Sequence, residues 1–280
     1  MSRRVRWSLT GLFVIALGVV VAHQLHLFAG SESTPVPLAE VEQRYNALTS
    51  TTIADPDPET ETDPDPDPGT DTDGPTTTTA NELAVPGVYM YATTGRDSVD
   101  ALTGAHHDYP ATTTITVIPT ACGIQQRWDV LEERGEEWQR CIDSDGVSEP
   151  GRTNYDEFFG QSQTDTWVCT GAPRPLAAAA GTTWSKTCVN GSAIDTYDGV
   201  VIGTEPQVVG TTTVDTLHVR VTITDDVSPD LQVIDTWYLA GTDLVVVQTS
   251  TAATTNDSPV GTVNYDETYG IRLSSLTPLG

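Results

Sequence analysis

The sequence predicts an all-β domain, built as a single antiparallel curved sheet or half-barrel, that follows an N-terminal transmembrane helix and a disordered acidic linker. Three observations predict this: period-two alternation of apolar and polar residues after residue 84, one long apolar run near the N-terminus, and a Pro- and Asp-rich stretch between them. We expect a cytoplasmic tip and anchor over 1–30, a short juxtamembrane helix over 31–48, a spacer over 49–83 and an extracytoplasmic β domain over 84–280.

The N-terminal segment has the length and charge pattern of a membrane anchor. Three arginines precede an apolar run of 22 residues from Trp7 to Phe28. As a helix this run reaches about 33 Å, enough to cross a hydrocarbon core of roughly 30 Å. The positive-inside rule places the N-terminus in the cytoplasm and the rest of the chain outside the cell membrane. A signal peptide cleaved after Ala22 is the alternative, and it also exports the β domain.

Two segments separate the anchor from the β domain. Leu38, Val41, Tyr45 and Leu48 recur at helical spacing and predict a short helix that lies on the bilayer or is undocked, with weak self-association as an alternative. The stretch 49–79 then holds nine acidic residues and no basic ones. Such a segment cannot bury enough apolar surface to offset its ordering entropy, so we expect an extended spacer.

The charge of the chain limits its partners. The sequence has 13 Lys and Arg against 39 Asp and Glu, a formal net charge of −26. This polyanion repels phosphate backbones, which argues against nucleic acid as a partner.

Alternating segments predict about ten strands in the β domain. In Val214–Ile223 the residues Leu217, Val219, Val221 and Ile223 share one face. The segment 126–142 reads as a hairpin that turns at Arg134-Gly135 and places Trp128 opposite Cys141. The segment 236–249 reads as a second hairpin that turns at 240–243. Further strands are expected at 88–93, 113–118, 164–169 and 263–276, and a loop at the polyalanine run 177–180.

The four cysteines predict two disulfides. Cys122, Cys141, Cys169 and Cys188 are separated by 19, 28 and 19 residues. Three connectivities are open, and the equal short spacings favour Cys122–Cys141 and Cys169–Cys188. A zinc site is the alternative, but the chain has no Cys-x-x-Cys pair and its expected compartment is oxidising.

A heptapeptide occurs twice, as NYDEFFG over 154–160 and as NYDETYG over 264–270. We interpret it as a structural recurrence in two strands, with Tyr155 and Glu157 on one face and Tyr265 and Glu267 on the equivalent face. A shared cation site is the alternative, and each copy could supply one carboxylate to it because adjacent strand residues point to opposite faces.

The sequence carries no catalytic fingerprint. It lacks a Gly-x-Ser-x-Gly elbow, a phosphate-binding glycine loop, a dinucleotide motif and a HExxH zinc motif, so we predict no catalytic residues, no metal and no cofactor. Three histidines are weak site candidates. His106 and His107 are expected in a loop between Gly104 and Pro110, and His218 is expected to make a cross-strand hydrogen bond.

The C-terminal segments HVRVTIT, DTWYLAGTDLVVVQT and VNYDETYGIRLSSL resemble the later strands of LolA-like half-barrel domains of bacterial lipoprotein carriers. The resemblance implies a concave apolar face that holds an acyl chain. This sequence departs from those carriers in its long spacer, its cysteines and its lack of a lipid-anchor cysteine. The anchor, the acidic spacer and the cysteine-containing domain also resemble exported proteins of high-GC Gram-positive bacteria.

These features together predict a membrane-tethered, non-catalytic binding module for a hydrophobic ligand, such as a lipid, or for an envelope protein. Five tryptophans are the expected ligand face: Trp128, Trp138, Trp167, Trp184 and Trp237. The first alternative is a structural envelope protein that contacts wall polymer. The second is an exported hydrolase built around His106, His107 and His218.

Overall fold

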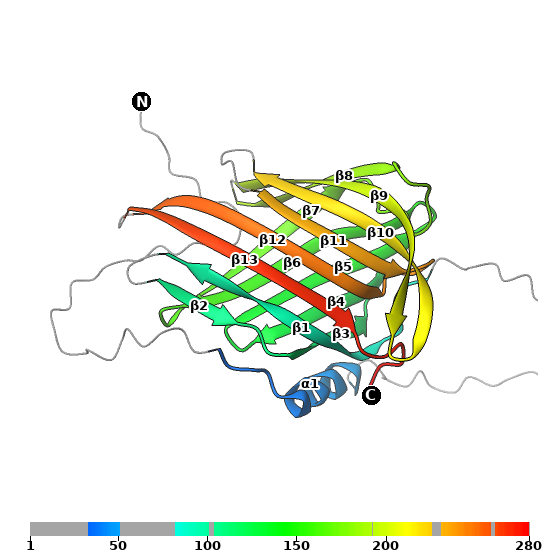
Figure 1. The fold of residues 1–280 in the computed structure, drawn as a ribbon, viewed down its shortest axis with the longest axis horizontal. Coiled ribbons are helices and arrows are strands. Elements are labelled where there is room, and N and C mark those ends of the chain that lie inside the picture. Colours follow the sequence, from blue (N-terminus) through cyan, green and yellow to red (C-terminus); the bar gives the residue numbers. More distant parts are fainter. Residues whose placement is uncertain are drawn as a thin grey trace, which may run out of the picture.

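The β domain is a closed antiparallel barrel of 12 strands (Figure 1). The computed structural model describes residues 33–50, 82–100, 104–191, 193–225, 231–258 and 261–279. These residues form α1 (Leu38–Ser50), β1 (Gly87–Val99), β2 (Ala105–Asp108), β3 (Thr112–Pro119), β4 (Gly123–Leu131), β5 (Arg134–Asp143), β6 (Gly146–Phe158), β7 (Gln161–Gly171), β8 (Thr183–Asn190), β9 (Ala193–Val209), β10 (Thr212–Asp225), β11 (Leu231–Leu239), β12 (Val245–Ser258) and β13 (Gly261–Leu273).

The strands follow one another around the barrel. From β3 to β13, consecutive strands pair with one another, and β1 pairs with β3 and β13. The closing pair runs from Tyr91 opposite Leu273 to Val99 opposite Tyr265. The short strand β2 pairs with the last residues of β1. The prediction of one all-β antiparallel sheet is confirmed, whereas the prediction that the sheet stays half-open is wrong.

Closure depends on contacts between the two ends of the domain, which no local pattern of residues reveals. At Gly95 in β1, φ is +146°, and a Cβ atom there would lie 2.5 Å from the carbonyl oxygen of Thr268. A side chain would therefore clash with β13. The glycine allows the last strand to approach the first closely enough to complete the ring.

The first predicted hairpin forms with a different register. β4 and β5 are joined at Glu132 and Glu133, and Trp128 lies opposite Glu136 instead of Cys141. Arg134 and Gly135, expected to form the turn, are buried at the start of β5. Burial of the Arg134 side chain among carboxylates inside the barrel, described below, is incompatible with an exposed turn.

The other predicted strands are confirmed. The segment 236–249 forms the β11–β12 hairpin, with Trp237 opposite Val247. The segments 88–93, 113–118 and 164–169 lie within β1, β3 and β7, and β13 covers most of 263–276. Polyalanine 177–180 lies outside the strands, as expected.

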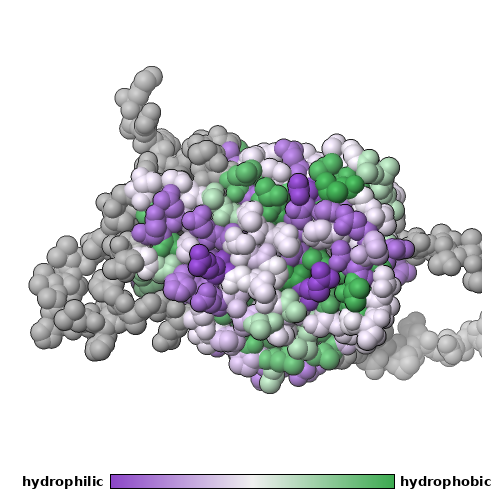
Figure 2. All heavy atoms as spheres, viewed as in Figure 1, coloured by the Kyte–Doolittle hydropathy of each residue, from purple (hydrophilic) through white to green (hydrophobic). Residues whose placement is uncertain are grey.

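The barrel is filled with side chains from alternate strand positions. The largest apolar cluster includes Tyr91, Trp128 and Val246, each at most 1 % exposed. Smaller clusters form around Ile223 and around Phe158. On the outer face shown in Figure 2, hydrophobic side chains form separate patches among hydrophilic ones.

Helix α1 packs against the outside of the barrel, below β1 and β3 in Figure 1. Its Val41 is fully buried. An Arg44 guanidinium nitrogen donates to an Asp129 carboxylate oxygen at 2.6 Å. Ahead of the helix, the Thr34 N–H donates to a Glu133 carboxylate oxygen at 2.9 Å. The expectation that this helix lies on the bilayer or is undocked is therefore wrong, because α1 contacts β1 and β3 and buries Val41.

Substitution of Val41 with alanine is expected to loosen α1. The change removes burial worth about 1–2 kcal/mol, and an isolated helix of 13 residues is only marginally stable in water. Hydrogen exchange of the α1 amides should accelerate. The matched control is Leu48→Ala on the same helix, where the side chain is 47 % exposed and exchange should stay unchanged. Equal acceleration in both variants would contradict docking through Val41.

Among the described residues, no helix has both the length and the apolar character that a membrane span requires. The predicted anchor over 1–30 lies outside the described residues, as does 51–81 of the predicted spacer.

Candidate functional site

The interior of the barrel contains a cavity of about 100 Å³. Its walls come from β5, β6 and β8 to β13, together with the segment that follows β7. Four basic side chains line it: Arg140, Arg152, Arg174 and Lys186. The whole chain has only 13 basic residues against 39 acidic ones. A cluster of four basic side chains in one cavity is therefore unusual for a protein with this negative net charge.

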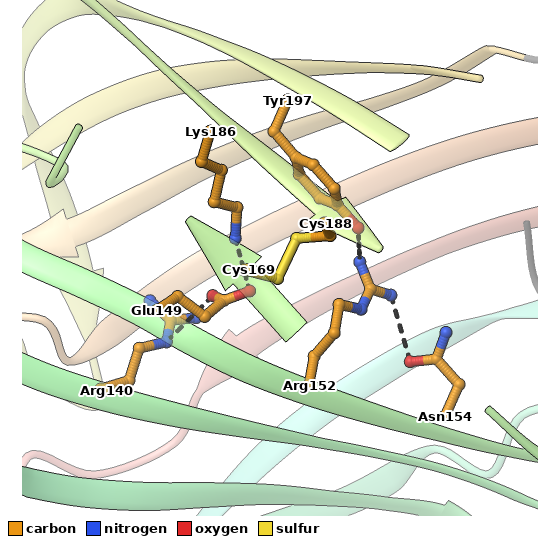
Figure 3. Close-up of a disulfide and its surroundings, with 8 residues drawn as sticks. All are labelled: Arg140, Glu149, Arg152, Asn154, Cys169, Lys186, Cys188 and Tyr197. Carbon is orange, nitrogen blue, oxygen red and sulfur yellow. Dashed lines mark hydrogen bonds and ion pairs between the residues drawn. A yellow bond between two sulfur atoms is a disulfide. The ribbon is translucent and has the colours of Figure 1, made fainter. Parts of the chain in front are cut away.

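Glu149 bridges two of these cations (Figure 3). The Lys186 ammonium donates to one Glu149 oxygen at 2.5 Å, and Arg140 Nε lies 3.3 Å from the other. Burial opposes ionisation of Glu149, but Lys186 and Arg140 outweigh it and hold the pKa of this carboxyl below its ordinary value. Burial lowers the pKa of Lys186 to about 8, although Glu149 acts in the opposite direction.

Arg152 is held by neutral groups. Its guanidinium donates to the Tyr197 hydroxyl, and its second terminal nitrogen donates to the Asn154 side-chain oxygen at 3.1 Å. The guanidinium carbon lies 5.6 Å from the centre of the Tyr197 ring. These contacts orient the cation, and the charges of Glu136, Glu149 and Asp195 also act on it.

Arg174 is the least satisfied of the four. It is 6 % exposed, and none of its three guanidinium nitrogens has a hydrogen-bond partner among the described residues. The guanidinium stacks 3.6 Å from the centre of the Tyr238 ring. Burial lowers the pKa of Arg174, and its acidic neighbours do not compensate. A buried cation without a hydrogen-bond partner is costly, so this guanidinium favours acceptor atoms that reach it from the cavity.

The backbone fixes Arg174 in this position. Its N–H donates to the Val147 carbonyl at 2.9 Å, and the Val147 N–H donates back at the same distance. At Gly146, φ is +143°, and a Cβ atom there would lie 2.2 Å from the Arg174 carbonyl oxygen. Only glycine permits this close approach, which joins the segment after β7 to β6.

The charges at the cavity do not balance. The four cations face Glu149 and Glu136 as the carboxylates of the lining, and Glu136 is itself bonded to Arg134. Among the lining side chains the cations exceed the carboxylates by two, or by three if Glu136 is assigned to Arg134. Two buried acids outside the lining also act on these cations: Asp243 on Arg140 and Arg174, and Asp195 on Arg152. Such a site suits an anionic ligand, because planar guanidinium groups bind carboxylate and phosphate oxygens in pairs.

The five tryptophans that were predicted to form one ligand face lie in different surroundings. Trp138 and Trp184 line the cavity. Trp184 packs flat on Gly199, where a Cβ atom would lie 2.2 Å from the indole ring. Trp128 and Trp167 are buried in separate apolar clusters. Trp237 stacks on His218, with ring centres 4.0 Å apart, and donates to Glu205.

The three candidate histidines are not brought together. His218 lies between carboxylates of Glu205 and Asp235, at 3.0 and 2.9 Å, which confirms its expected cross-strand hydrogen bonds. His107 is buried in β2, not in a loop, and its ring nitrogen Nδ1 lies 2.8 Å from Asp97. His106 is on the same strand but 63 % exposed. The histidine constellation expected of a hydrolase is therefore not assembled.

The two heptapeptide copies do not present the same face. Asp156 of the first copy and Glu267 of the second are buried, whereas their neighbours Glu157 and Asp266 face outward. The first copy ends in a turn at Phe159-Gly160, where φ is 56° and 67°, while the second continues through β13. The predicted equivalence of faces is wrong. A one-residue shift is sufficient to reverse every side chain of a strand.

Both copies nevertheless contribute to one cluster. The Arg134 guanidinium lies 3.1 Å from Asp156 and 3.2 Å from Glu267. The cation that the two heptapeptide copies share is therefore the side chain of Arg134. The described residues contain no group of His, Cys, Asp and Glu that could hold a metal ion.

Both predicted disulfides, Cys122–Cys141 and Cys169–Cys188, are present. The second joins adjacent strands beside the cationic side chains (Figure 3).

No family model, curated protein or solved structure matches this chain. The arrangement of the cavity itself is therefore the basis for a functional conclusion.

Proposed function

We propose that this protein is a non-catalytic binding module that holds a small oxoanion, such as a carboxylate, phosphate or sulfate, inside the barrel. The observation that carries this proposal is Arg174, a buried cation on the cavity wall with no hydrogen-bond partner among the described residues. Three further cations and the aromatic rings of Trp138 and Trp184 surround the same space. Binding of an anion would supply the missing acceptors.

The size of the cavity favours a small ligand. Drug-sized ligands occupy pockets of roughly 300–1,000 Å³, whereas this cavity measures about 100 Å³. A long acyl chain, which the resemblance to lipoprotein carriers implies, does not fit this volume. The proposal therefore keeps the binding role and replaces the hydrophobic ligand with an anion.

We place the barrel outside the cell membrane, tethered by residues 1–30. Two features support this placement: disulfides, which persist in oxidising compartments, and the arginine-led apolar run of the N-terminus.

Arg174→Leu is expected to weaken anion binding about 10- to 100-fold, because a hydrogen bond to a charged group is worth about 1.5–3 kcal/mol. The measurement is isothermal titration calorimetry of the full chain in detergent, with sulfate, phosphate and succinate as probes at low ionic strength. Arg272→Leu is the matched control, since Arg272 is exposed on the outer face and the charge change is identical. Absence of binding by every probe, or equal losses in both variants, would refute the site.

A further inference from the structure

A second group of charged side chains is buried in the barrel beside the anion cavity. At its centre, one terminal nitrogen of Arg134 donates to a Glu136 oxygen at 2.5 Å and to a Glu267 oxygen at 3.2 Å. The Arg134 Nε lies 3.1 Å from an Asp156 oxygen. Arg134, Glu136, Asp156 and Glu267, here called the Arg134 cluster, are at most 6 % exposed.

The surroundings of the Arg134 cluster contain a cation, Arg152 of β6, whose charge interacts with Glu136. The Tyr109 hydroxyl donates to Glu267 at 2.5 Å, and Tyr265 and Tyr269 of β13 are buried nearby. Asp97 of β1 also acts on Glu267 and Asp156, and its own carboxylate is bonded to His107 of β2. From β7, the charge of Asp165 acts on Asp156.

Three carboxylates surround one guanidinium in a desolvated interior. Like charges at such short range disfavour each other's ionised form, so the cluster is partly protonated near neutral pH. The pKa values of two of these carboxyl groups are accordingly raised. Burial, opposed by Arg134, raises the pKa of Glu267 to about 7 and that of Asp156 to about 6.

The Arg134 cluster and the anion cavity share a residue. Glu136 lines the cavity and is bonded to Arg134. Tyr269, which also lines the cavity, is two residues from Glu267 on the same face of β13. An anion in the cavity therefore adds negative charge at the edge of a cluster that is already short of positive charge.

We propose that anion binding in the cavity is coupled to proton uptake by the Arg134 cluster, so that the protein binds its anion more tightly as the medium becomes mildly acidic. This inference rests on the proposed function and adds its regulation. The coupling is reciprocal, because a proton that favours the anion is itself favoured by the anion. One linked proton changes the affinity by up to about tenfold per pH unit.

The test uses sulfate, whose own charge is constant over the pH range involved. Sulfate affinity of the full chain is measured by calorimetry between pH 5.5 and 7, where Lys186, with a pKa of about 8, is already protonated. Repeating the titration in buffers with different ionisation enthalpies gives the number of protons taken up. We expect affinity to rise several-fold toward pH 5.5, with net proton uptake near pH 7.

Glu267→Gln is expected to flatten this pH dependence and reduce the proton uptake, because the amide imitates the protonated acid and cannot titrate. Asp156→Asn is a second variant with the same expected direction. Glu137→Gln is the matched control: Glu137 neighbours Glu136 on β5 but lies on the opposite face, so the pH dependence should persist.

The outcomes separate the two proposals. Sulfate binding that is independent of pH, without proton uptake, overturns the coupling and leaves the anion site intact. The same slope in wild type and Glu267→Gln also overturns it. Failure of sulfate to bind at any pH overturns both proposals for this anion.

Discussion

Replacement of Arg134 with methionine is expected to lower the free energy of unfolding by about 3–5 kcal/mol at pH 7, because it leaves buried carboxylates without their cation. Glu136, Asp156 and Glu267 all lie within 3.2 Å of this guanidinium. Urea unfolding followed by tryptophan fluorescence measures the loss. Addition of Glu267→Gln to Arg134→Met should recover part of it, since one of the stranded charges is then absent.

The loss should also depend on pH, with a defined sign. The folded-state pKa of Glu267 is about 7 and that of Asp156 about 6, both above the ordinary carboxyl value of about 4. The stability contributed by these raised values is present at low pH and is lost as the pH rises through 6 and 7. Without Arg134 both pKa values rise further, so Arg134→Met should be less destabilising at pH 5 than at pH 8.

Arg220→Met is the control for this experiment. Arg220 is half exposed, and its partner Asp235 keeps a second contact to His218. Exposed ion pairs contribute about 0–1 kcal/mol, so the loss should be small and nearly independent of pH. Equal losses for Arg134→Met and Arg220→Met would mean that the buried cluster does not stabilise the barrel.

The strands could be predicted because their cause is local. Alternation in Val214–Ile223 assigns Leu217 and Val219 to one face, and the structure buries both. Equal cysteine spacings likewise identified both disulfides. Closure could not be predicted, because it pairs β1 with β13 across most of the domain. The β4–β5 register was missed because Gly135 suggested a turn, whereas Arg134 is required inside the barrel.

The cavity escaped prediction for a related reason. Its cations come from four elements, and each alone resembles a solvated side chain. One signal was available: the chain has 13 basic residues, and five of them lie between Arg134 and Lys186. In a protein with a net charge of −26, basic residues within segments of alternating apolar and polar residues are candidates for the barrel interior. The heptapeptide drew attention to Asp156 and Glu267, but their common partner Arg134 lies outside both copies.

The Cys169–Cys188 disulfide links β7 and β8, the adjacent barrel strands with the fewest paired residues, here called the β7–β8 seam. β7 and β8 pair at only four positions, from Val168 opposite Val189 to Gly171 opposite Lys186. β4 and β5 pair at eight positions; Cys122 directly precedes β4, and Cys141 lies in β5. Two cations of the cavity depend on the short seam: Lys186 lies in it, and Arg174 follows β7 by a few residues. We therefore expect this disulfide to position the proposed anion site as well as to stabilise the fold.

Removal of either disulfide by serine substitution is expected to cost about 3 kcal/mol of unfolding free energy in the chain-entropy model, since both close loops with a separation of 19 residues. Their effects on binding should differ. Cys169→Ser/Cys188→Ser should lose sulfate affinity, because the β7–β8 seam opens and Lys186 moves. Cys122→Ser/Cys141→Ser should keep it, because eight residue pairs still hold Arg140. Urea unfolding and calorimetry test both statements, and retained affinity in the first variant would show that the seam holds without its disulfide.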